Sequence, residues 1–428
     1  MKNRTRAKTT LAAALLALLA TPTAAAELAP AAPAKVEPEL APDNELLARI
    51  EALPDNTWMK LPPVKTSGDL AWCGKPDWPN SENMPKFGPG LRGYSLKMAW
   101  AADRKRALYC GTHHGVFPIT NDVWEYDLAA NTWVCVYASD PSLLSGGTVE
   151  FFQKNAVFKD GIVQTPRGGQ VRAIHTWSGL TYDSDRHRML WFVPKGRGCT
   201  FTDRQTLAKG LGFQDEKELL AKWRTGTVGR YTTTYIWSFD PFGKKWEILT
   251  EGVPVFDEGQ SAEYIADRKM VWASWGAQLY DPDKKATTDP KAKGKTAGVG
   301  EVVAAYDPES KTVVMVSQNK TNTYSFATNE WKVVQDNAIA SGADMRSYMA
   351  YDLVATKFIL DTVDKGPQGQ NQSGLYLYDL ARNEWTEAKP QGDTAPPGGG
   401  GYYDPERNVT VKYTGRDTYV YRCKRAAK

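Results

Sequence analysis

Residues 126–133 read YDLAANTW, and the same pattern returns at later places in the chain. Its copies are FDPFGKKW at 239–246, YSFATNEW at 324–331 and YDLARNEW at 378–385, while YDPDKK at 280–285 keeps the turn without the Trp. Each full copy places an aromatic residue at the end of one strand, then a polar turn, then a Trp in the next strand. The pattern predicts a β-hairpin whose aromatic side chains pack on neighbouring sheets.

A second pattern alternates with the first and consists of a strand, an acidic turn and an apolar strand. Its six copies are WAADRKRALYC at 100–110, YDSDRHRMLWF at 182–192, IADRKMVWA at 265–273, YDPESKTVVMV at 306–316, YDLVATKFILD at 351–361 and YDPERNVTVKY at 403–413. Together the two patterns define a unit of four strands, a to d, that repeats every 40 to 50 residues or so, which is typical of a propeller blade.

The last unit is incomplete, and the start of the chain supplies its missing strand. Six acidic a–b turns are followed by only five c–d turns, because the last unit stops at TYVYRCKRAAK after strand c. Residues 55–61 read DNTWMKL and match the pattern of strand d through Trp58. We therefore expect a six-bladed β-propeller in which an N-terminal strand completes the C-terminal blade and removes an exposed edge.

These repeats resemble kelch repeats, as in the propeller domain of the galactose-oxidase-like superfamily, over roughly Asn56 to Lys428. The resemblance implies an all-β kelch-type propeller of a divergent kind, because the Gly pair that usually follows strand b is reduced to Gly111 in the first unit. A copper-radical oxidase is not expected, since no Tyr-His pair can be placed in this chain and fold does not imply function. A β-sandwich is the alternative fold, but it does not call for complementation between the chain ends.

The first 26 residues have the composition of a signal peptide. Lys2, Arg4, Arg6 and Lys8 precede an apolar run of ten residues, and three alanines end at Ala26. Because a membrane-spanning helix needs about 20 apolar residues, we expect export to the periplasm or the extracellular space without membrane insertion. The predicted division is a signal peptide at 1–26, a flexible linker with a short helix at 27–52, and the propeller at 53–428.

Charge and cysteine content exclude several classes of protein. Residues 1–26 hold four of the 53 basic residues and none of the 49 acidic ones, so the remainder is balanced and gives no attraction to nucleic acid. Five cysteines are too few for a disulfide scaffold in a chain of this length. We expect a monomer stabilised by an aromatic-rich core, with Cys73 and Cys199 as a possible disulfide.

The long connections fall on one predicted face, which carries the b–c and d–a loops. They span 62–92, 138–171 and 194–231, with further Gly-, Pro- and Gln-rich loops at 361–375 and 387–401. The segment 194–231 lies in blade two and contains the one clearly helical stretch, at about 203–223. Because functional residues concentrate on loops held by a rigid scaffold, we expect the site on this face, at blades one and two.

Basic, histidine and tryptophan side chains on these loops are the candidate ligand-binding residues: Arg92, His113, His114, Arg172, His175, Trp177 and Arg197. Arg suits carboxylates, and Trp suits sugars or cations. Adjacent histidines do not easily reach one ion, so we expect no metal and no cofactor. No nucleophile or phosphate-loop motif is present.

Three functions fit these features. The first is an exported scaffold that binds a glycan, a peptide or a protein through the long loops of blades one and two. The second is a carbohydrate-acting enzyme with its site at the channel mouth, and the third is a structural component of the cell envelope. The residues alone do not decide whether the chain is an enzyme.

Overall fold

Aspartates at strand ends build the tight turns that the sequence predicts. Asp183 accepts hydrogen bonds through Oδ1 from the backbone N–H groups of Asp185 and Arg186, both at 3.1 Å. His187 then takes a left-handed conformation with φ of 55° and leads into the next strand. Such Asx turns fix strand reversal locally. The same pair of hydrogen bonds is made by Asp240, Asp281, Asp307, Asp352 and Asp404.

A computed structural model shows how these hairpins assemble, and the propeller lies within the unit Lys35–Lys428. The described residues are 40–78, 81–112, 120–141, 147–171, 175–192, 204–222, 227–228, 231–232, 235–251, 261–274, 278–296, 302–317, 319–336, 346–365 and 369–426.

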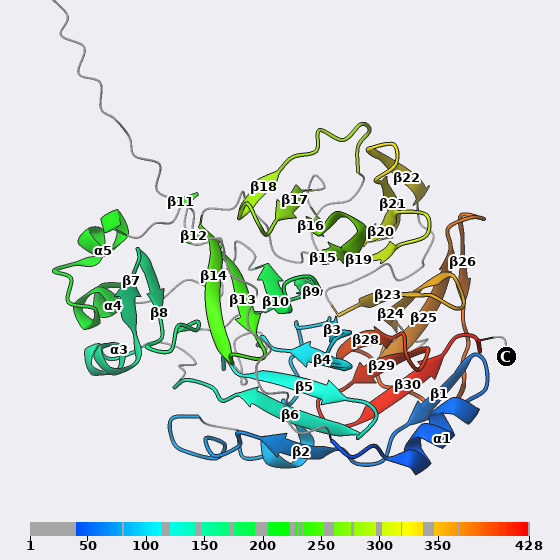
Figure 1. Cartoon of the computed structure of the whole chain (residues 1–428), viewed down its shortest axis with the longest axis horizontal. Helices are drawn as coiled ribbons and strands as arrows, with labels where there is room; N and C mark the ends of the chain where they lie inside the picture. The colour runs from blue at the N-terminus through cyan, green and yellow to red at the C-terminus, as the bar shows by residue number, and fades with distance from the viewer. Residues whose placement is uncertain are drawn as a thin grey trace, which may run out of the picture. The chain divides into compact units, whose positions relative to one another are not determined.

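Six antiparallel sheets form six blades, and each blade contains strands a to d in order from the inside outward (Figure 1). Blade one is β3 (Ala99–Ala101), β4 (Arg106–Tyr109), β5 (Val123–Asp127) and β6 (Thr132–Tyr137). Blade two is β9 (Leu180–Asp183), β10 (Arg188–Phe192), β13 (Tyr235–Asp240) and β14 (Lys245–Glu251). Blade three is β15 (Ala262–Ile265), β16 (Met270–Ala273), β17 (Gln278–Asp281) and β18 (Ala286–Thr288).

The second half of the chain repeats this order. Blade four is β19 (Val302–Asp307), β20 (Thr312–Ser317), β21 (Lys320–Ser325) and β22 (Glu330–Asp336). Blade five is β23 (Tyr348–Asp352), β24 (Lys357–Lys365), β25 (Asn371–Asp379) and β26 (Glu384–Glu387). Blade six is β28 (Gly400–Asp404), β29 (Val409–Tyr413), β30 (Thr418–Arg422) and β1 (Thr57–Lys60). Each inner strand contacts the inner strand of the next blade, and β28 contacts β3, so the ring is closed.

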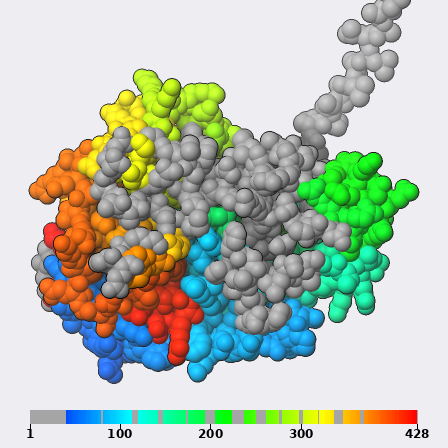
Figure 2. All heavy atoms as spheres, turned by 180° about the vertical axis from the view of Figure 1, so that it is seen from behind, coloured from blue at the N-terminus to red at the C-terminus, as the bar shows by residue number. Residues whose placement is uncertain are grey.

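The predicted closure by an N-terminal strand is confirmed. Strand β1 pairs antiparallel with β30, with Trp58 opposite Tyr421 and Lys60 opposite Tyr419. Figure 2 accordingly shows blue N-terminal residues beside red C-terminal ones. The Tyr421 hydroxyl donates to Asn56 Oδ1 at 2.9 Å, across the two ends of the chain.

The same tyrosine–asparagine contact occurs within unbroken hairpins. There the asparagine follows the tyrosine by five residues and takes a left-handed conformation. These pairs are Tyr126–Asn131, Tyr324–Asn329, Tyr378–Asn383 and Tyr403–Asn408, each at 2.8 Å. The interrupted blade therefore reproduces the turn geometry of the continuous ones.

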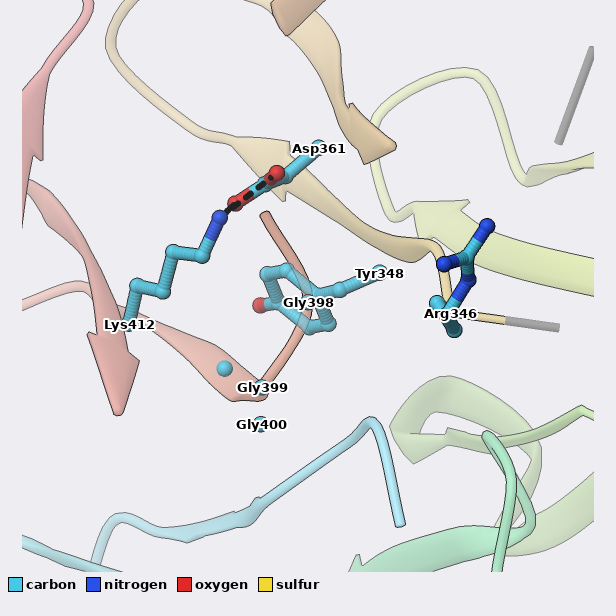
Figure 3. Close-up of a pocket in the computed structure, with 8 residues that line it drawn as sticks. Arg346, Tyr348, Asp361, Gly398, Gly399, Gly400 and Lys412 are labelled. Atoms are coloured by element: carbon cyan, nitrogen blue, oxygen red, sulfur yellow. Dashed lines mark hydrogen bonds and ion pairs between the residues drawn. The ribbon is translucent and has the colours of Figure 1, made fainter. Parts of the chain in front are cut away.

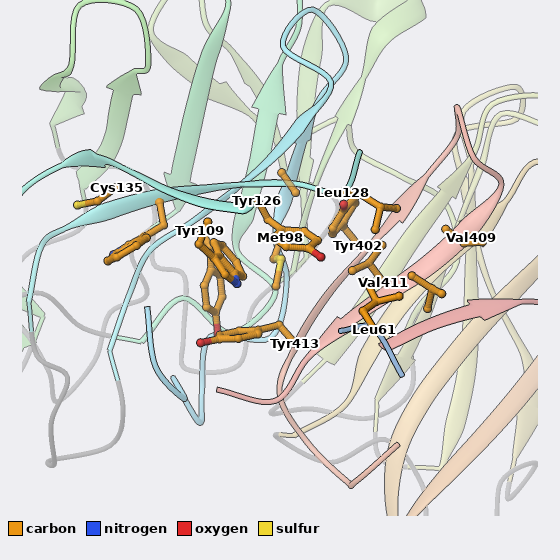
Figure 4. Packing of buried hydrophobic residues seen from close by; sticks show 14 of the residues in the cluster. Leu61, Met98, Tyr109, Tyr126, Leu128, Cys135, Tyr402, Val409, Val411 and Tyr413 are labelled. Atoms are coloured by element: carbon orange, nitrogen blue, oxygen red, sulfur yellow. The ribbon is translucent and has the colours of Figure 1, made fainter. Parts of the chain in front are cut away.

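Apolar clusters between neighbouring blades form the core, because each strand presents alternate side chains to its two faces. Between blades six and one, Tyr109 and Tyr126 pack with Tyr402 and Tyr413 (Figure 4). Separate clusters join blades one and two, two and three, three and four, four and five, and five and six. The burial of aromatic and β-branched side chains thus follows the whole ring.

Small elements extend the blades. Strand β2 (Lys65–Gly68) runs parallel to β6, and β27 (Gln391–Gly392) runs parallel to β1. Helix α1 (Asn44–Ala52) buries Leu46 and Ile50, and its N-cap is Asp43, whose side chain accepts from the backbone N–H of Leu46. Four further short elements are α2 (Met84–Phe87), the 3-10 helix at Ala266–Arg268, β11 (Thr227–Val228) and β12 (Tyr231–Thr232).

A lobe beside blade two contains the predicted helical insertion (Figure 1). The insertion forms two helices, α4 (Arg204–Gly210) and α5 (Glu216–Lys222), with a turn between them. They share an apolar cluster with α3 (Val149–Asn155), β7 (Val157–Lys159) and β8 (Ile162–Gln164), elements that precede blade two in the chain. None of the described helices has the length and hydropathy needed to cross a membrane.

The expectation of a loop over 361–375 is wrong for most of that range. Strand β24 continues to Lys365 and β25 begins at Asn371, and the two strands pair over eight residues, from Phe358↔Tyr378 to Lys365↔Asn371. Polar residues such as Asn371 and Gln372 continue a strand here because they are exposed and their backbone groups are paired across the hairpin. Asp361 therefore lies on a strand, which matters for the site.

Candidate functional site

The starts of the inner strands form the rim of the channel on the face that carries the b–c and d–a connections. Isolated parallel bridges join Lys97 to Gly401, Ser95 to Trp177, and Ser178 to Ser261. These bridges connect blades six, one, two and three at one level. The backbone is therefore linked across these four blades at the level of the rim.

A pocket opens at this rim between blades five and six (Figure 3). It is a shallow hollow that is open to solvent and too narrow to enclose a water molecule. The residues that line it are Arg346, Tyr348, Asp361, Gly398, Gly399, Gly400, Gly401 and Lys412.

Strand pairing positions the polar residues of the pocket. Tyr348 begins β23 and lies opposite Asp361 in β24, while Gly401 in β28 lies opposite Lys412 in β29. Strands a and b of two adjacent blades therefore supply the four residues from rigid elements. Binding groups held on strands keep their geometry better than groups held on loops.

Asp361 and Lys412 form a buried ion pair inside the pocket. Lys412 Nζ lies 2.6 Å from Asp361 Oδ2, and the side chains are 4% and 6% exposed. Ser373 Oγ donates to Asp361 Oδ1 at 3.3 Å. Burial raises the pKa of Asp361, and the Lys412 ammonium opposes that shift. The carboxylate and the ammonium group are oriented toward one another (Figure 3).

Gly401, the last of four consecutive glycines, lets the Tyr348 ring approach the start of blade six. A Cβ on Gly401 would lie 2.8 Å from Cδ1 of that ring. Gly398 and Gly399 have φ values of 77° and 106°, a region that favours glycine. The run PPGGGG at 396–401 was the available sequence signal, because glycine in a strand often marks a close approach. This run was not among the residues predicted to bind a ligand.

A second ion pair crosses the channel from blade one to blade three. Lys97 Nζ lies 2.5 Å from Glu263 Oε1 and donates to the carbonyl oxygen of Ala262 at 2.7 Å. Burial raises the pKa of Glu263, while Lys97 lowers it. The Glu263 charge also contributes to raising the pKa of Tyr348, after the larger effect of burial. The pocket and this ion pair thus belong to one polar environment at the rim.

An aromatic group lies at the rim of blades one and two, where the sequence predicted ligand-binding residues. The His175 ring centroid is 4.5 Å from that of Trp177 and 5.0 Å from that of Tyr94. Trp177 has φ of 43°, which is rare for a bulky residue and is associated with strained functional segments. Both predicted residues are largely buried, at 9% and 5% exposure.

Arg92 faces the interior instead of the rim. It is fully buried, forms an ion pair with Asp122 and donates to the carbonyl oxygen of Gly111 at 2.6 Å. A buried arginine paired in this way orders the start of blade one. In this structure its guanidinium is therefore in contact with protein groups and is not presented to a ligand.

Several predicted residues lie outside the described part of the chain: His113, His114, Arg172, Arg197 and Cys199. Their proposed contacts stay predictions. Cys73, the other half of the predicted disulfide, is described and carries a free thiol. Over the described ranges, no group of three or more His, Cys, Asp and Glu side chains is arranged to hold a metal ion.

The comparisons with known proteins give no family assignment. No family model matches the chain, and no curated protein matches it. Among solved structures, the chain is similar to the crystal structure of an auxiliary nutrient binding protein from Bacteroides ovatus. The identity is 8%, the TM-score is 0.45, and the match covers 86% of this chain and 77% of that one. The architecture therefore rests on the six sheets described above.

Proposed function

We propose that this chain is an exported binding protein that holds a glycan at the channel rim. The observation that carries the proposal is the Asp361–Lys412 pair beside Tyr348 at a shallow hollow of the rim. Sugar hydroxyls both donate and accept hydrogen bonds, so they fit a site with an oriented carboxylate, an ammonium group and a phenol. Aromatic rings add apolar surface for the sugar faces.

Binding is favoured over glycoside hydrolysis by the composition of the pocket. Asp361 is the one carboxylate among the eight described lining residues, and it is engaged by Lys412. Hydrolysis usually requires two carboxyl groups on opposite sides of the scissile bond. We also propose that the connections of blades one and two, which carry His113, His114, Arg172 and Arg197, extend the site across the rim.

A glycan array followed by calorimetry tests this function. We expect Asp361→Asn to weaken binding of the best array ligand at least tenfold, because the substitution removes a charged acceptor and disturbs Lys412. Asp404→Asn is the matched control, since Asp404 is also buried and paired with an arginine, but lies in a tight turn on the opposite face. Equal affinities for the wild type and both variants, or no glycan bound by the wild type, would contradict the proposal.

Export and kelch kinship belong to the same proposal. The basic start, the apolar run of ten residues and the three alanines ending at Ala26 support removal of residues 1–26. The repeated Tyr-Asp turns followed by Trp support a relation to kelch repeats. N-terminal sequencing of the protein recovered from the periplasm or medium tests export. We expect Glu27 as the first residue, and an intact Met1 would contradict processing.

A further inference from the structure

The segment after β2 folds back over the outer strand of blade one. Gly68, the last residue of β2, is the Cα partner of Cys135 in β6. The next residue, Asp69, donates its backbone N–H to the Cys135 carbonyl oxygen at 3.0 Å. A turn follows, in which the Cys73 N–H donates to the carbonyl oxygen of Leu70 at 3.1 Å. Because the chain turns here, Cys73 lies back toward β6, the strand that carries Cys135.

The two thiols share one apolar environment. Cys135 belongs to the core cluster between blades six and one, and the half-buried Cys73 packs against the same cluster. Trp72, which directly precedes Cys73 in the sequence, is buried in the same cluster. Burial raises the pKa of both thiols, to about 12 for Cys73, and the charge on Cys73 adds to the rise at Cys135.

We propose that Cys73 and Cys135 are a disulfide-forming pair that fastens the connection after β2 to the outer edge of blade one. Both thiols are free in the structure, so the reaction starts from the reduced pair. The half-buried Cys73 is the accessible sulfur and attacks a small-molecule disulfide as its thiolate, and Cys135 then displaces the mixed disulfide. Two S–H bonds and the S–S bond of the oxidant are lost, one S–S bond forms in the protein, and the oxidant takes two electrons and two protons to become two thiols.

This pairing competes with the Cys73–Cys199 pairing expected from the sequence, and peptide mapping separates them. The full chain is treated with oxidised glutathione, digested at acidic pH without reductant, and analysed by mass spectrometry. We expect a cross-linked peptide that contains Cys73 and Cys135, retained in Cys110→Ser and Cys423→Ser variants. A Cys73–Cys199 peptide, or a Cys73 that stays open to alkylation after oxidation, would overturn the proposal.

Thermal unfolding gives a second readout that does not depend on glycan binding. A cross-link over a long loop restricts the unfolded chain, so we expect reductant to lower the unfolding midpoint of the oxidised wild type by several degrees. The Cys73→Ser variant should show no such dependence, because it cannot form the cross-link. Its half-buried position tolerates a hydroxyl, so the variant should still fold. A drop of the same size in Cys73→Ser would assign the effect to other thiols and refute the pairing.

Discussion

At the scale of single residues, a short contact between a tyrosine and an asparagine recurs around the ring. The asparagine takes a left-handed conformation, which a short polar side chain tolerates better than most, and the tyrosine hydroxyl holds its side-chain oxygen. The contact between Tyr421 and Asn56 is the informative copy, because 365 sequence positions separate its partners. Its presence shows that blade six has the turn geometry of the continuous blades.

We expect Tyr421→Phe to lower the free energy of unfolding by about 1 kcal/mol, because it removes one hydrogen bond and leaves the Asn56 side-chain oxygen without its donor. Urea denaturation measures the change. Tyr378→Phe is the matched control, since Tyr378 makes the same contact with Asn383 inside an unbroken hairpin. A loss in Tyr378→Phe without any loss in Tyr421→Phe would mean that the joined ends are not formed in solution.

At the scale of elements, three short segments add a parallel partner to an outer strand, and each ends in Gly after the pattern K-x-x-G. They are Lys65–Gly68 beside β6, Lys291–Gly294 beside β22 and Lys389–Gly392 beside β1. In each case the glycine has positive φ, and a Cβ there would overlap a carbonyl oxygen of the outer strand. The pattern thus marks where a connection crosses to the next blade.

We expect Gly294→Ala to destabilise the protein by about 3 kcal/mol. Part of this loss comes from the left-handed backbone conformation, and the rest comes from overlap of the new Cβ with the Trp331 carbonyl oxygen. Gly212→Ala is the control for strain alone, because Gly212 has φ of 83° but no atom within 4 Å of its added Cβ. That variant should lose only about 1 kcal/mol in the same denaturant titration. Equal losses for the two variants would show that the crossing segment is not packed as described.

How much the sequence could predict depends on how local each feature is. The hairpins were predictable because Asp183 or Asn131 determines a turn within a few residues. The crossing segments were not predicted, because two to four residues with no hydrophobic alternation carry little signal. The pocket was not predicted either. Asp361 and Lys412 are 51 positions apart, and only the packing of blade five on blade six brings them together.

At the scale of the whole molecule, closure of the ring determines where everything else lies. The inner strands contact one another in sequence and then from β28 back to β3. Because β1 completes blade six, the edge that would otherwise be exposed on β30 is paired. The pocket borders this same blade, through Gly398 to Gly401 and Lys412.

Cross-linking across the closing strand tests the closure of the ring most directly. Lys60 in β1 is the Cα partner of Tyr419 in β30. The next pair, Leu61 and Thr418, is hydrogen-bonded, so Lys60 and Tyr419 form a non-hydrogen-bonded pair. The Cα atoms of such a pair lie about 4.5 Å apart. We expect the variant Lys60→Cys with Tyr419→Cys to form an intramolecular disulfide on oxidation, identified by peptide mapping, while Lys60→Cys with Val333→Cys in blade four forms none. Absence of the first cross-link in folded protein, or equal yields for both pairs, would contradict a ring sealed by the two ends of the chain.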